Sequence, residues 1–517
     1  MVTKILLLDL FFDAFLLQYQ KSIRGYLPMT SIASAMLTLS RDAITQAVSP
    51  IDIGNRLELF VDDYLIDEIA GATQRLHHPQ PQEVACVYDN PWEGSTCGYK
   101  TVFQDGDLYR MYYRGSHVIY TTEGFDNDHH PQVVCYAESH DGIHWTKPEL
   151  GLIEFDGGKR NNIIWEGVGS HNFAPFKDEN PDCKPDEKYK ALGSAERTLY
   201  AFKSADGIHW SLMNDEPVIT KGAFDSQNLA FWDTVRGEYR EYHRDFREGR
   251  DIRTGTSKDF LNWTDPEWLD YSPSRVSELY TNQIIPYYRA PHIFLGFPTR
   301  YNDRGWTEST KALPELEYRR LRGYVSEREG TAVTDGMFMS SRDGHHFNVW
   351  PESFIRPGLR LRGNWFYGDN YQNWGLVETE SHIDGAPDEI SVYASEDSHQ
   401  GDDCRYRRYT LRIDGFVSMQ GPLSGGEFVT KPLTFKGDQL AINFSTSAAG
   451  SIQVEIQETS GNAIPGFGLD DCPEVFGDDL ERVVTWENGT DVSRLSGQVI
   501  RLRFLLKDAD LYSIRFS

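Results

Sequence analysis

The sequence is poor in cysteine and in basic charge, and both shortages exclude classes of protein. Its six cysteines contain no C-x-x-C pair, so the spacing of a structural zinc site is missing. Lys and Arg number 51 against 78 Asp and Glu, a net charge of -27, which argues against nucleic acid or an anionic membrane as a partner. We expect free thiols, with a Cys86–Cys97 bridge as the alternative in an oxidising compartment.

Long apolar runs are also absent. No uncharged stretch reaches transmembrane length, and the run from Lys4 to Leu17, which resembles the core of a signal peptide, is interrupted by Asp9 and Asp13. We expect residues 1–54 to form a poorly ordered or signal-like extension. The sequence therefore predicts a soluble protein and leaves secretion or a periplasmic location open.

Aromatic residues and one recurring string are what the sequence does contain. It has 27 Tyr, 28 Phe and 12 Trp, which suits β-sheets and stacking on sugars alike. The pattern S-x-D-x-x-x-aromatic starts at Ser139, Ser204, Ser257 and Ser341, and Ser395 to Asp397 resembles a decayed fifth copy. Asp-Gly after a strand forms a tight turn, so we interpret each copy, called a box below, as a structural hairpin tip.

The spacing of the boxes predicts an all-β fold, a five-bladed β-propeller followed by a C-terminal β-sandwich. The blades are expected at about 95–148, 165–215, 224–265, 278–350 and 369–415, inside a propeller domain of residues 55–415. A polar segment at about 301–330 interrupts the fourth blade. The run from Leu57 to Ile66 is expected to close the ring.

From residue 416 onward the boxes stop and short alternating strands follow. We expect them at 440–444, 452–456, 483–486, 499–505 and 512–516, separated by turns such as Asn488-Gly489. This pattern is typical of a β-sandwich, and the domain is predicted to span residues 416–517.

In a propeller the innermost strands line a central funnel, where polar residues from all blades can converge. Asp225 and Glu278 open comparable segments of adjacent blades, and Glu93 is a third carboxylate near the first blade. Paired carboxylates at this spacing suit glycoside cleavage, one as acid and one as base or nucleophile. We expect Glu278 to be the acid, because desolvation and Asp225 would raise its pKa.

The other polar and aromatic residues at these strand ends are predicted to bind substrate. They are Trp92, Tyr99, Asn172, Gln227, Asn228, Arg244, Asn282, Arg300, Asp369, Asn373 and Trp374. Arginines at the ends of second strands could bind a carboxylate or sulfate on the sugar. His129-His130 and His345-His346 lack further ligands at metal spacing, so neither a metal nor a cofactor is predicted.

Three segments carry a resemblance to a known superfamily: LYRMYYRG (108–115), FDSQNLAFWD (224–233) and ELYTNQIIPY (278–287). Together with the boxes, they resemble the five-bladed propeller glycosidases of glycoside hydrolase families 32 and 43. The resemblance implies an exo-acting glycosidase on an oligo- or polysaccharide, with acidic residues on successive inner strands. It transfers that role to Asp225 and Glu278, and to Glu93.

The sequence departs from family 32 in its motifs. Asn90 to Gly94 replaces the opening W-x-N-D-P-x-G without its Asp, Arg244-Asp245-Phe246 only partly matches R-D-P, and the E-C acid motif is missing. These departures argue against cleavage of fructose bonds.

Three other functions stay open. A carbohydrate-binding propeller without catalysis predicts that the funnel carboxylates do not pair. A glycoside phosphorylase requires an Arg/His cluster beside a single acid. A sialidase needs three convergent arginines, for which Arg114, Arg244 and Arg300 are candidates. A homodimer is compatible with the two-domain layout.

Overall fold

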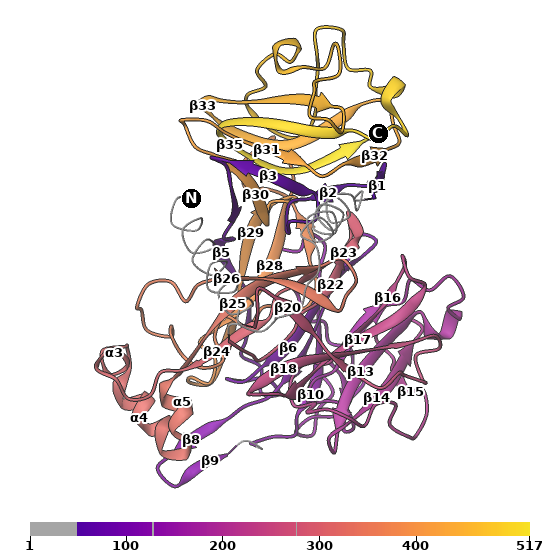
Figure 1. Ribbon diagram of the computed structural model, residues 1–517. Helices are drawn as coiled ribbons and strands as arrows, with labels where there is room; N and C mark the ends of the chain where they lie inside the picture. Colours follow the sequence, from indigo (N-terminus) through magenta and orange to yellow (C-terminus); the bar gives the residue numbers. More distant parts are fainter. Residues whose placement is uncertain (1–48, 127–128, 276) are drawn as a thin grey trace, which may run out of the picture. The chain divides into compact units, whose positions relative to one another are not determined.

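The structure is a computed structural model and describes residues 49–126, 129–275 and 277–517. The predicted N-terminal extension, 1–54, lies outside the described residues up to position 48. The described chain is nearly all-β, as predicted, with a propeller-like arrangement of four-stranded sheets (Figure 1). In this part of the chain, no helix is long and apolar enough to cross a membrane.

Three four-stranded antiparallel sheets follow one another along the chain, as their alternating apolar residues and intervening turns predict. The first contains β6 (Gly98–Asp105), β7 (Leu108–Gly115), β10 (Val133–Ser139) and β11 (Ile163–Glu166). The second contains β12 (Ala174–Lys177), β13 (Tyr189–Ala195), β14 (Thr198–Ser204) and β15 (Ser211–Leu212). The third contains β16 (Leu229–Asp233), β17 (Glu238–Phe246), β18 (Arg250–Ser257) and β19 (Glu267–Trp268).

A fourth four-stranded sheet joins distant parts of the sequence. β27 (Val377–Thr379), β28 (Glu389–Glu396) and β29 (Cys404–Arg412) pair in order, and β5 (Gln80–Tyr88) completes the sheet beside β29. A strand from the N-terminal side thus finishes a C-terminal sheet, as expected of a closed ring. The segment predicted for this role, 57–66, is the wrong one, because its strands pair elsewhere.

A seven-stranded sheet lies between the third and fourth of these in sequence. Its strands are β20 (Asp270–Ser272), β21 (Glu278–Leu279), β22 (Ile285–Tyr287), β23 (Ala290–Gly296), β24 (Thr299–Asp303), β25 (Ala332–Ser341) and β26 (His346–Ile355).

The polar segment at 301–330 forms the α-helices of the described chain. They are α3 (Glu308–Lys311), α4 (Leu316–Val325) and α5 (Glu327–Thr331), all between β24 and β25. α4 contacts the hairpin of β8 (Ile119–Thr121) and β9 (Gly124–Asp126), and Figure 1 shows them side by side. The segment that interrupts the repeats therefore adds a wall beside the sheets.

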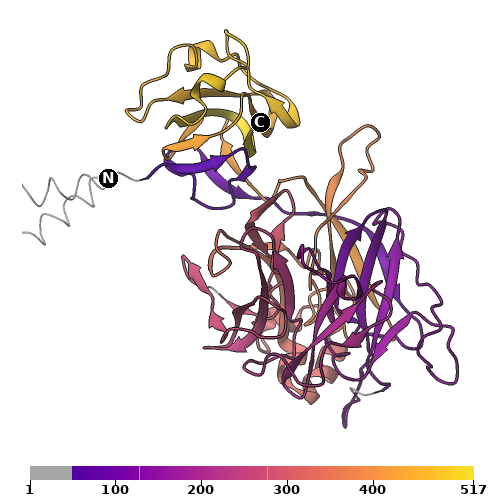
Figure 2. The same ribbon diagram turned by 90° about the vertical axis from the view of Figure 1, so that its right-hand side faces the viewer.

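The C-terminal strands form an eight-stranded sheet with strands from the N-terminal side (Figure 2). It contains β2 (Glu58–Leu59), β3 (Ile66–Ala70), β4 (Thr73–Leu76), β30 (Val417–Gly421), β31 (Gly426–Thr430), β33 (Leu440–Gln457), β34 (Asp478–Val483) and β35 (Arg501–Phe516). β1 (Ile51–Gly54) and β32 (Leu433–Phe435) lie outside this sheet.

In this region the sequence predicts several short strands, but the structure has fewer and longer strands. The predicted strands 440–444 and 452–456 are one strand, β33, and 512–516 continues the strand that holds most of 499–505. The domain limits predicted at 55 and 416 stay a prediction.

The four boxes are hairpin tips with one repeated bonding pattern. Each Ser hydroxyl lies within hydrogen-bond distance of the Asp Oδ1 two residues later, at 2.8, 3.1, 3.1 and 3.2 Å in chain order. The same hydroxyl accepts from the backbone N–H three residues on. The suggested fifth copy is wrong, because the Ser395 hydroxyl donates instead to the carbonyl of Gly368 at 2.7 Å.

All six cysteines are free, and all but Cys183 are buried. The expected free thiols are therefore present, and the Cys86–Cys97 alternative is wrong. The sheets pack through apolar residues such as Leu229, Phe294 and Met339, which belong to one continuous buried cluster.

Candidate functional site

A cavity of about 260 Å³ lies where the four-stranded sheets and the seven-stranded sheet meet. Each of these sheets contributes a wall residue at the end of a strand or directly beside one: Tyr99, His171, Gln227, Tyr280 and Tyr371. The sequence places polar residues at these positions, and the fold brings them to one point.

Asp225 is held at the cavity by its neighbours on both sides. Its backbone carbonyl accepts from the Tyr99 hydroxyl at 2.8 Å and lies 3.2 Å from Nε2 of His171. Its carboxylate forms an ion pair with Arg244, whose side chain is 2% exposed while that of Asp225 is 65% exposed. Asp225 therefore presents a carboxylate that solvent can reach, and the buried Arg244 fixes its position.

His171 stays neutral in this setting. Burial lowers the pKa of its imidazole to about 3, and the guanidinium groups of Arg114 and Arg244 act in the same direction. Arg114 lies 3.2 Å from Nδ1 of His171 through Nη1 and donates to the carbonyl of Thr96 at 2.9 Å. The cluster on this side of the cavity thus carries two fixed positive charges.

The opposite wall comes from the polar insertion and the β8–β9 hairpin. Arg328 and Glu329 of α5 line the cavity with Tyr120 of β8 and His399. Glu329 accepts from Tyr120 at 3.2 Å and forms ion pairs with Arg322 at 3.3 Å and Arg328 at 3.2 Å. Arg322 and Arg328 therefore balance the negative charge of Glu329 within the cavity wall.

Two arginines, Arg114 and Arg328, line the cavity. Nε of Arg114 and Nη1 of Arg328 are buried and have no hydrogen-bond partner among the described residues. Arginine side chains suit a ligand with acceptor oxygens or a negative charge.

Tyr280 lies in the wall between these groups. Its phenolic oxygen accepts a hydrogen bond from the Tyr367 hydroxyl at 2.6 Å, and the guanidinium carbon of Arg244 lies 4.5 Å from its ring centroid. Burial would raise the pKa of Tyr280, but Arg244, Tyr367 and Arg328 outweigh burial and lower it. The same burial raises the pKa of Tyr367 well above its usual value.

The fold brings three of the predicted site residues, Tyr99, Asp225 and Gln227, into the cavity wall, and Arg244 adjoins them. Glu278 is not in that wall. Its carboxylate accepts from Nη1 of Arg250 at 2.7 Å and from the backbone of Arg250 at 3.1 Å. Asp225 and Glu278 are thus each held by a different arginine.

Glu93 is buried away from this wall. It accepts from the Tyr113 hydroxyl at 2.5 Å and pairs with Nζ of Lys147 at 2.7 Å. Trp92 next to it donates to Asn162 at 2.7 Å. Every one of these polar groups has a partner inside the protein.

The predicted amides connect backbone segments. Asn172 and Asn228 both donate to the carbonyls of Phe224 and Ser226. Asn282 lies 3.3 Å from the carbonyls of Gln227 and Tyr242, and Asn373 donates to Gly375 at 2.8 Å. The four are buried, and their donors hold neighbouring strands together.

The remaining predicted residues also lie outside the cavity wall. Trp374 donates to the carbonyl of Ile284 at 2.9 Å, and Arg300 pairs with Asp335 at 2.6 Å. Asp369 is 2% exposed, and burial raises the pKa of its carboxyl to about 8 although two backbone N–H groups donate to it.

Several wall residues were absent from the predicted set. They are Tyr120, Arg328, Glu329, Tyr367, Tyr371 and His399. The Arg- and Glu-rich composition of the 301–330 insertion was the available signal for Arg328 and Glu329. Tyr280 lies two residues after Glu278 in the segment ELYTNQIIPY, which the sequence singles out.

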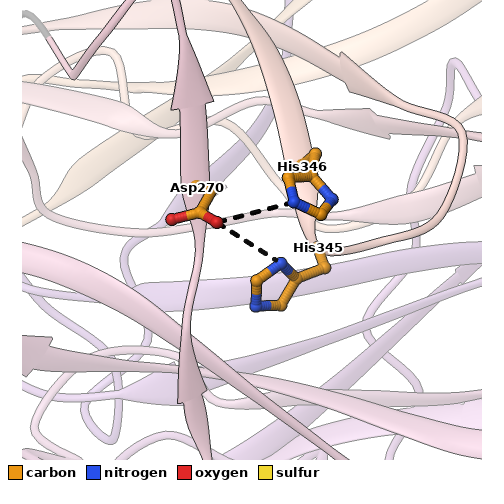
Figure 3. Close-up of side chains that lie close together, drawn as sticks. All are labelled: Asp270, His345 and His346. Atoms are coloured by element: carbon orange, nitrogen blue, oxygen red, sulfur yellow. Dashed lines mark ion pairs between the residues drawn. The ribbon is translucent and has the colours of Figure 1, made fainter.

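One group with metal-ligand atoms lies elsewhere, at Asp270, His345 and His346 (Figure 3). Asp270 Oδ2 lies 3.5 Å from Nε2 of His346 and 4.0 Å from Nδ1 of His345. Asp270 and His346 are exposed, and Nδ1 of His346 lies 2.7 Å from Asp343 of its own box. Ion pairing within the box and with its neighbour accounts for these contacts.

Comparison with known proteins gives partial matches. No family model matches the chain. Two uncharacterized proteins of Mycobacterium tuberculosis, from strains CDC 1551 and H37Rv, are 27% identical over 143 residues. The match spans 26% of this chain and 40% of the length of each relative.

Solved structures that resemble the chain include glycoside hydrolases. A glycosyl hydrolase from Bacteroides ovatus has a TM-score of 0.36 at 13% identity and covers 69% of this chain and 93% of its own. A family 43 arabinoxylan arabinofuranohydrolase from Bacillus subtilis, in complex with cellotetraose, has a TM-score of 0.28 at 11% identity and covers 85% and 99%. A fructofuranosidase from Schwanniomyces occidentalis, complexed with fructosylnystose, has a TM-score of 0.33 at 12% identity and covers 90% and 98%.

The TM-scores of these structures are too low to carry an argument about this chain. Any function for this chain must therefore be argued from its own residues.

Proposed function

We propose that the protein is a glycoside hydrolase that cleaves its substrate in the central cavity, with Asp225 as the acid/base. The observation that carries this proposal is the position of Asp225, an accessible carboxylate in a cavity lined by tyrosines and amides. Aromatic faces and amides hold sugar rings and hydroxyls, and a positioned carboxyl can protonate the leaving oxygen. The ion pair with Arg244 fixes the orientation of the carboxylate.

The proposed architecture is a five-bladed propeller with the seven-stranded sheet as its fourth blade, followed by a sandwich built around the eight-stranded sheet. We propose exo action. The cavity, at about 260 Å³, is smaller than the roughly 300–1,000 Å³ of pockets that enclose drug-sized ligands. A terminal sugar unit fits this description better than the middle of a polymer.

The substrate in this proposal carries a negative charge. Arg114 and Arg328 line the cavity, and guanidinium groups bind carboxylates and sulfates with two parallel bonds. A uronic acid or a sulfated sugar meets this requirement.

The test is a panel of 4-nitrophenyl glycosides, with neutral sugars, uronic acids and sulfated sugars, assayed with the wild type and two variants. D225N should lower kcat by about 10²–10⁴-fold, the usual contribution of general acid–base catalysis. E278Q tests the second predicted carboxylate: because Glu278 does not line the cavity, the kcat of E278Q should fall much less than that of D225N. Activity of D225N close to that of the wild type would contradict the role of Asp225.

A glycoside phosphorylase is the second candidate, because Arg114 and His171 stand beside a cavity with one accessible carboxylate, as that function requires. Inorganic phosphate distinguishes the two enzymes. A phosphorylase converts the substrate to a sugar phosphate and stops without phosphate, whereas a hydrolase turns over in phosphate-free buffer. Sugar binding without turnover on the whole panel would favour the carbohydrate-binding alternative.

A further inference from the structure

We propose that Asp270, His345 and His346 together bind one Zn²⁺ ion, which fastens the edge strand β20 to the fourth box. Figure 3 shows the three side chains, which meet from two segments that are distant in the sequence. None of the three lines the central cavity. The inference is therefore independent of the proposed glycosidase function and concerns a second site.

The fold supplies the ligand that the sequence spacing lacks. The sequence offers His345-His346 without a further ligand at metal spacing. β20 lies at the edge of the seven-stranded sheet and pairs in parallel with β26, in a register that places Asp270 opposite His346. The backbone N–H of Asp270 also donates to the carbonyl of His345 at 3.1 Å. Backbone pairing thus holds the carboxylate beside both imidazoles.

The ligand atoms are spaced nearly as a small tetrahedral ion requires. Zinc binds imidazole nitrogen and carboxylate oxygen at about 2.0–2.2 Å, so two of its ligand atoms lie about 3.3–3.5 Å apart. Oδ2 of Asp270 lies 3.5 Å from Nε2 of His346 and 4.0 Å from Nδ1 of His345. One ligand atom of each residue lies within 4.8 Å of those of the other two. Small rotations of the side chains therefore bring all three into contact with one ion.

The other nitrogen of each imidazole faces a second carboxylate. Nδ1 of His346 lies 2.7 Å from Oδ2 of Asp343, and Nε2 of His345 lies 3.6 Å from Oε2 of Glu267. A ligating histidine usually donates its remaining N–H to such a group, which fixes the tautomer and the ring orientation. Both histidines thus turn the nitrogen that would bind the metal toward Asp270. The ion pairs of the structure already hold the ligands near the positions that the metal requires.

The charges around the site favour a cation. Among the described residues, the ion-pair partners of Asp270, Asp343 and Glu267 are the two histidines, and none is Lys or Arg. The neighbouring cations are engaged elsewhere: Arg342 pairs with other carboxylates, and Lys431 donates to backbone carbonyls. A divalent cation would balance the negative charge of the three carboxylates.

The donor set selects the kind of metal. Two imidazoles and one carboxylate suit zinc, whereas Ca²⁺ and Mg²⁺ take mainly oxygen ligands. Asp270 and His346 also border a cavity of about 390 Å³, which leaves room for a water as the fourth ligand.

The fourth box differs from its counterparts at the position that completes the site. In the first and second boxes, His144 and His209 lie 2.7 and 2.8 Å from the Asp of their own box, as in the fourth. Ile143 and Ile208 precede them, where the fourth box has His345. Their ion pairs in the described chain are with that Asp. The shared histidine therefore belongs to the hairpin tip, and the additional ligands are particular to the fourth box.

The first test is calorimetric titration with Zn²⁺ alone. The full chain, without a histidine tag and freed of metal by a chelator, should bind one ion per chain. H345I gives the fourth box the isoleucine of the first two, and D270N removes the charged ligand. Loss of a supporting carboxylate costs about 10–100-fold in metal affinity, so E267Q should fall within that range and H345I and D270N beyond it.

H209A is the matched control, because His209 has the exposure and the Asp contact of His346 without the other ligands. Its zinc affinity should stay within about twofold of the wild type. An equal loss in H209A and H345I, or none in H345I and D270N, would mean that zinc binds exposed histidines indiscriminately and would overturn the site. Thermal midpoints check folding, and D270N, which keeps the side-chain shape, gives the same readout if H345I does not fold.

X-ray absorption spectroscopy of the zinc-loaded wild type identifies the ligands without a variant. It should show two imidazole nitrogens together with oxygen at about 2.0–2.2 Å. A shell of oxygens alone, or a single imidazole, would contradict the assignment.

Hydrogen exchange tests whether the ion fastens β20. Exchange of the backbone amides of β20 should slow when Zn²⁺ is added to the wild type and stay unchanged in H345I, because opening of the edge strand would break a metal bond. Zinc binding with unchanged exchange in the wild type would overturn the fastening role.

Discussion

The four hairpin tips repeat one structural pattern, whereas the walls of the central cavity do not. The four boxes have nearly the same hydrogen bonds, from Ser to Asp and from backbone to both. The cavity walls share no pattern: one sheet supplies Tyr99 and Arg114, another His171, and another Tyr280. Recurrence along this chain therefore marks the parts that build the fold, and chemistry is expected where the repeats diverge.

The boxes also connect neighbouring sheets in a repeated manner. Tyr112, Tyr242 and Tyr393 donate their hydroxyl groups to the carbonyls of Gly207, Gly344 and Gly142, each the glycine of a box in another sheet. Phe260 occupies the equivalent position of the third box and adopts the left-handed conformation, with φ of +67°. Its ring is buried in the core, which compensates for the unfavourable backbone.

The largest expected effect is a contrast between stability and turnover: a substitution in a box should lower the first, and one in the cavity the second. W210A should lower the free energy of unfolding by about 3–5 kcal/mol, because the indole is buried and packs 4.9 Å from the Phe173 ring. D225N should instead abolish most turnover while the thermal midpoint stays nearly unchanged. Urea denaturation and initial rates on both variants test the contrast. A stable W210A with altered substrate preference would show that the boxes are not purely structural.

A glycine pair tests the close packing of the box. A Cβ on Gly207, where φ is +80°, would lie 2.7 Å from the Tyr112 hydroxyl oxygen. G207A should cost about 2–3 kcal/mol of stability, from the left-handed backbone and the clash together. Gly237 has φ of +63° and nothing within 4 Å of such a Cβ, so G237A should cost only about 1 kcal/mol. Equal losses would mean that the clash contributes nothing.

Asp206 of the second box and the buried Asp369 should respond to pH in opposite directions. Burial would raise the pKa of Asp206 in its box, but hydrogen bonds from His209, Ile208 and Ser204 lower it far below its usual range. Burial raises the pKa of Asp369 to about 8. The folded protein then keeps a proton on Asp369 that the unfolded chain releases near pH 4.

The stabilising contribution of Asp369 is therefore complete below about pH 4 and is lost as the pH rises towards 8, with a slope of up to about 1.4 kcal/mol per pH unit. The free energy of unfolding of D369N, measured by urea denaturation between pH 5 and 8, should lack this decline. Parallel curves for D369N and the wild type would mean that Asp369 is ionised in the folded protein.

The smallest expected effect concerns the tyrosine contact between sheets. Y242F removes the donor to the Gly344 carbonyl, a bond of 2.7 Å, and should cost about 1–2 kcal/mol with no effect on kcat. Y112F removes the equivalent bond of 3.1 Å to Gly207 and should behave alike. A loss in Y242F but none in Y112F would restrict this role to one pair of sheets.

The sequence predicted the structure correctly where a residue type has a single structural role. Asp-Gly after a strand gives a turn in three of the four boxes, and Gly142, Gly207 and Gly344 all have positive φ. The sequence was less successful for polar residues before inner strands, since a buried Asn that connects backbones and an Asn that binds sugar leave the same sequence pattern. Asn172 and Asn228 are connectors in this sense.

The residues that sequence reasoning missed come from segments with no fixed partner in the repeat. Arg328 lines the cavity from α5, which packs on α4, and α4 contacts the β8–β9 hairpin some 200 residues away in sequence. Tyr280 gains its character from Arg244 and Tyr367, which lie on other strands and loops. Such properties belong to pairs of residues, and no local pattern encodes them.

The pairing of β5 with β29 has a consequence for how the protein is made. Residues such as Glu83 and Arg408, which form an ion pair across these strands, are 325 positions apart. While the ribosome is still translating the intervening chain, β5 has no partner and its edge can pair with other chains. Contacts of such separation also slow folding. The growing polypeptide thus depends on protection from aggregation until β29 has emerged, and fragments that end before it should be insoluble.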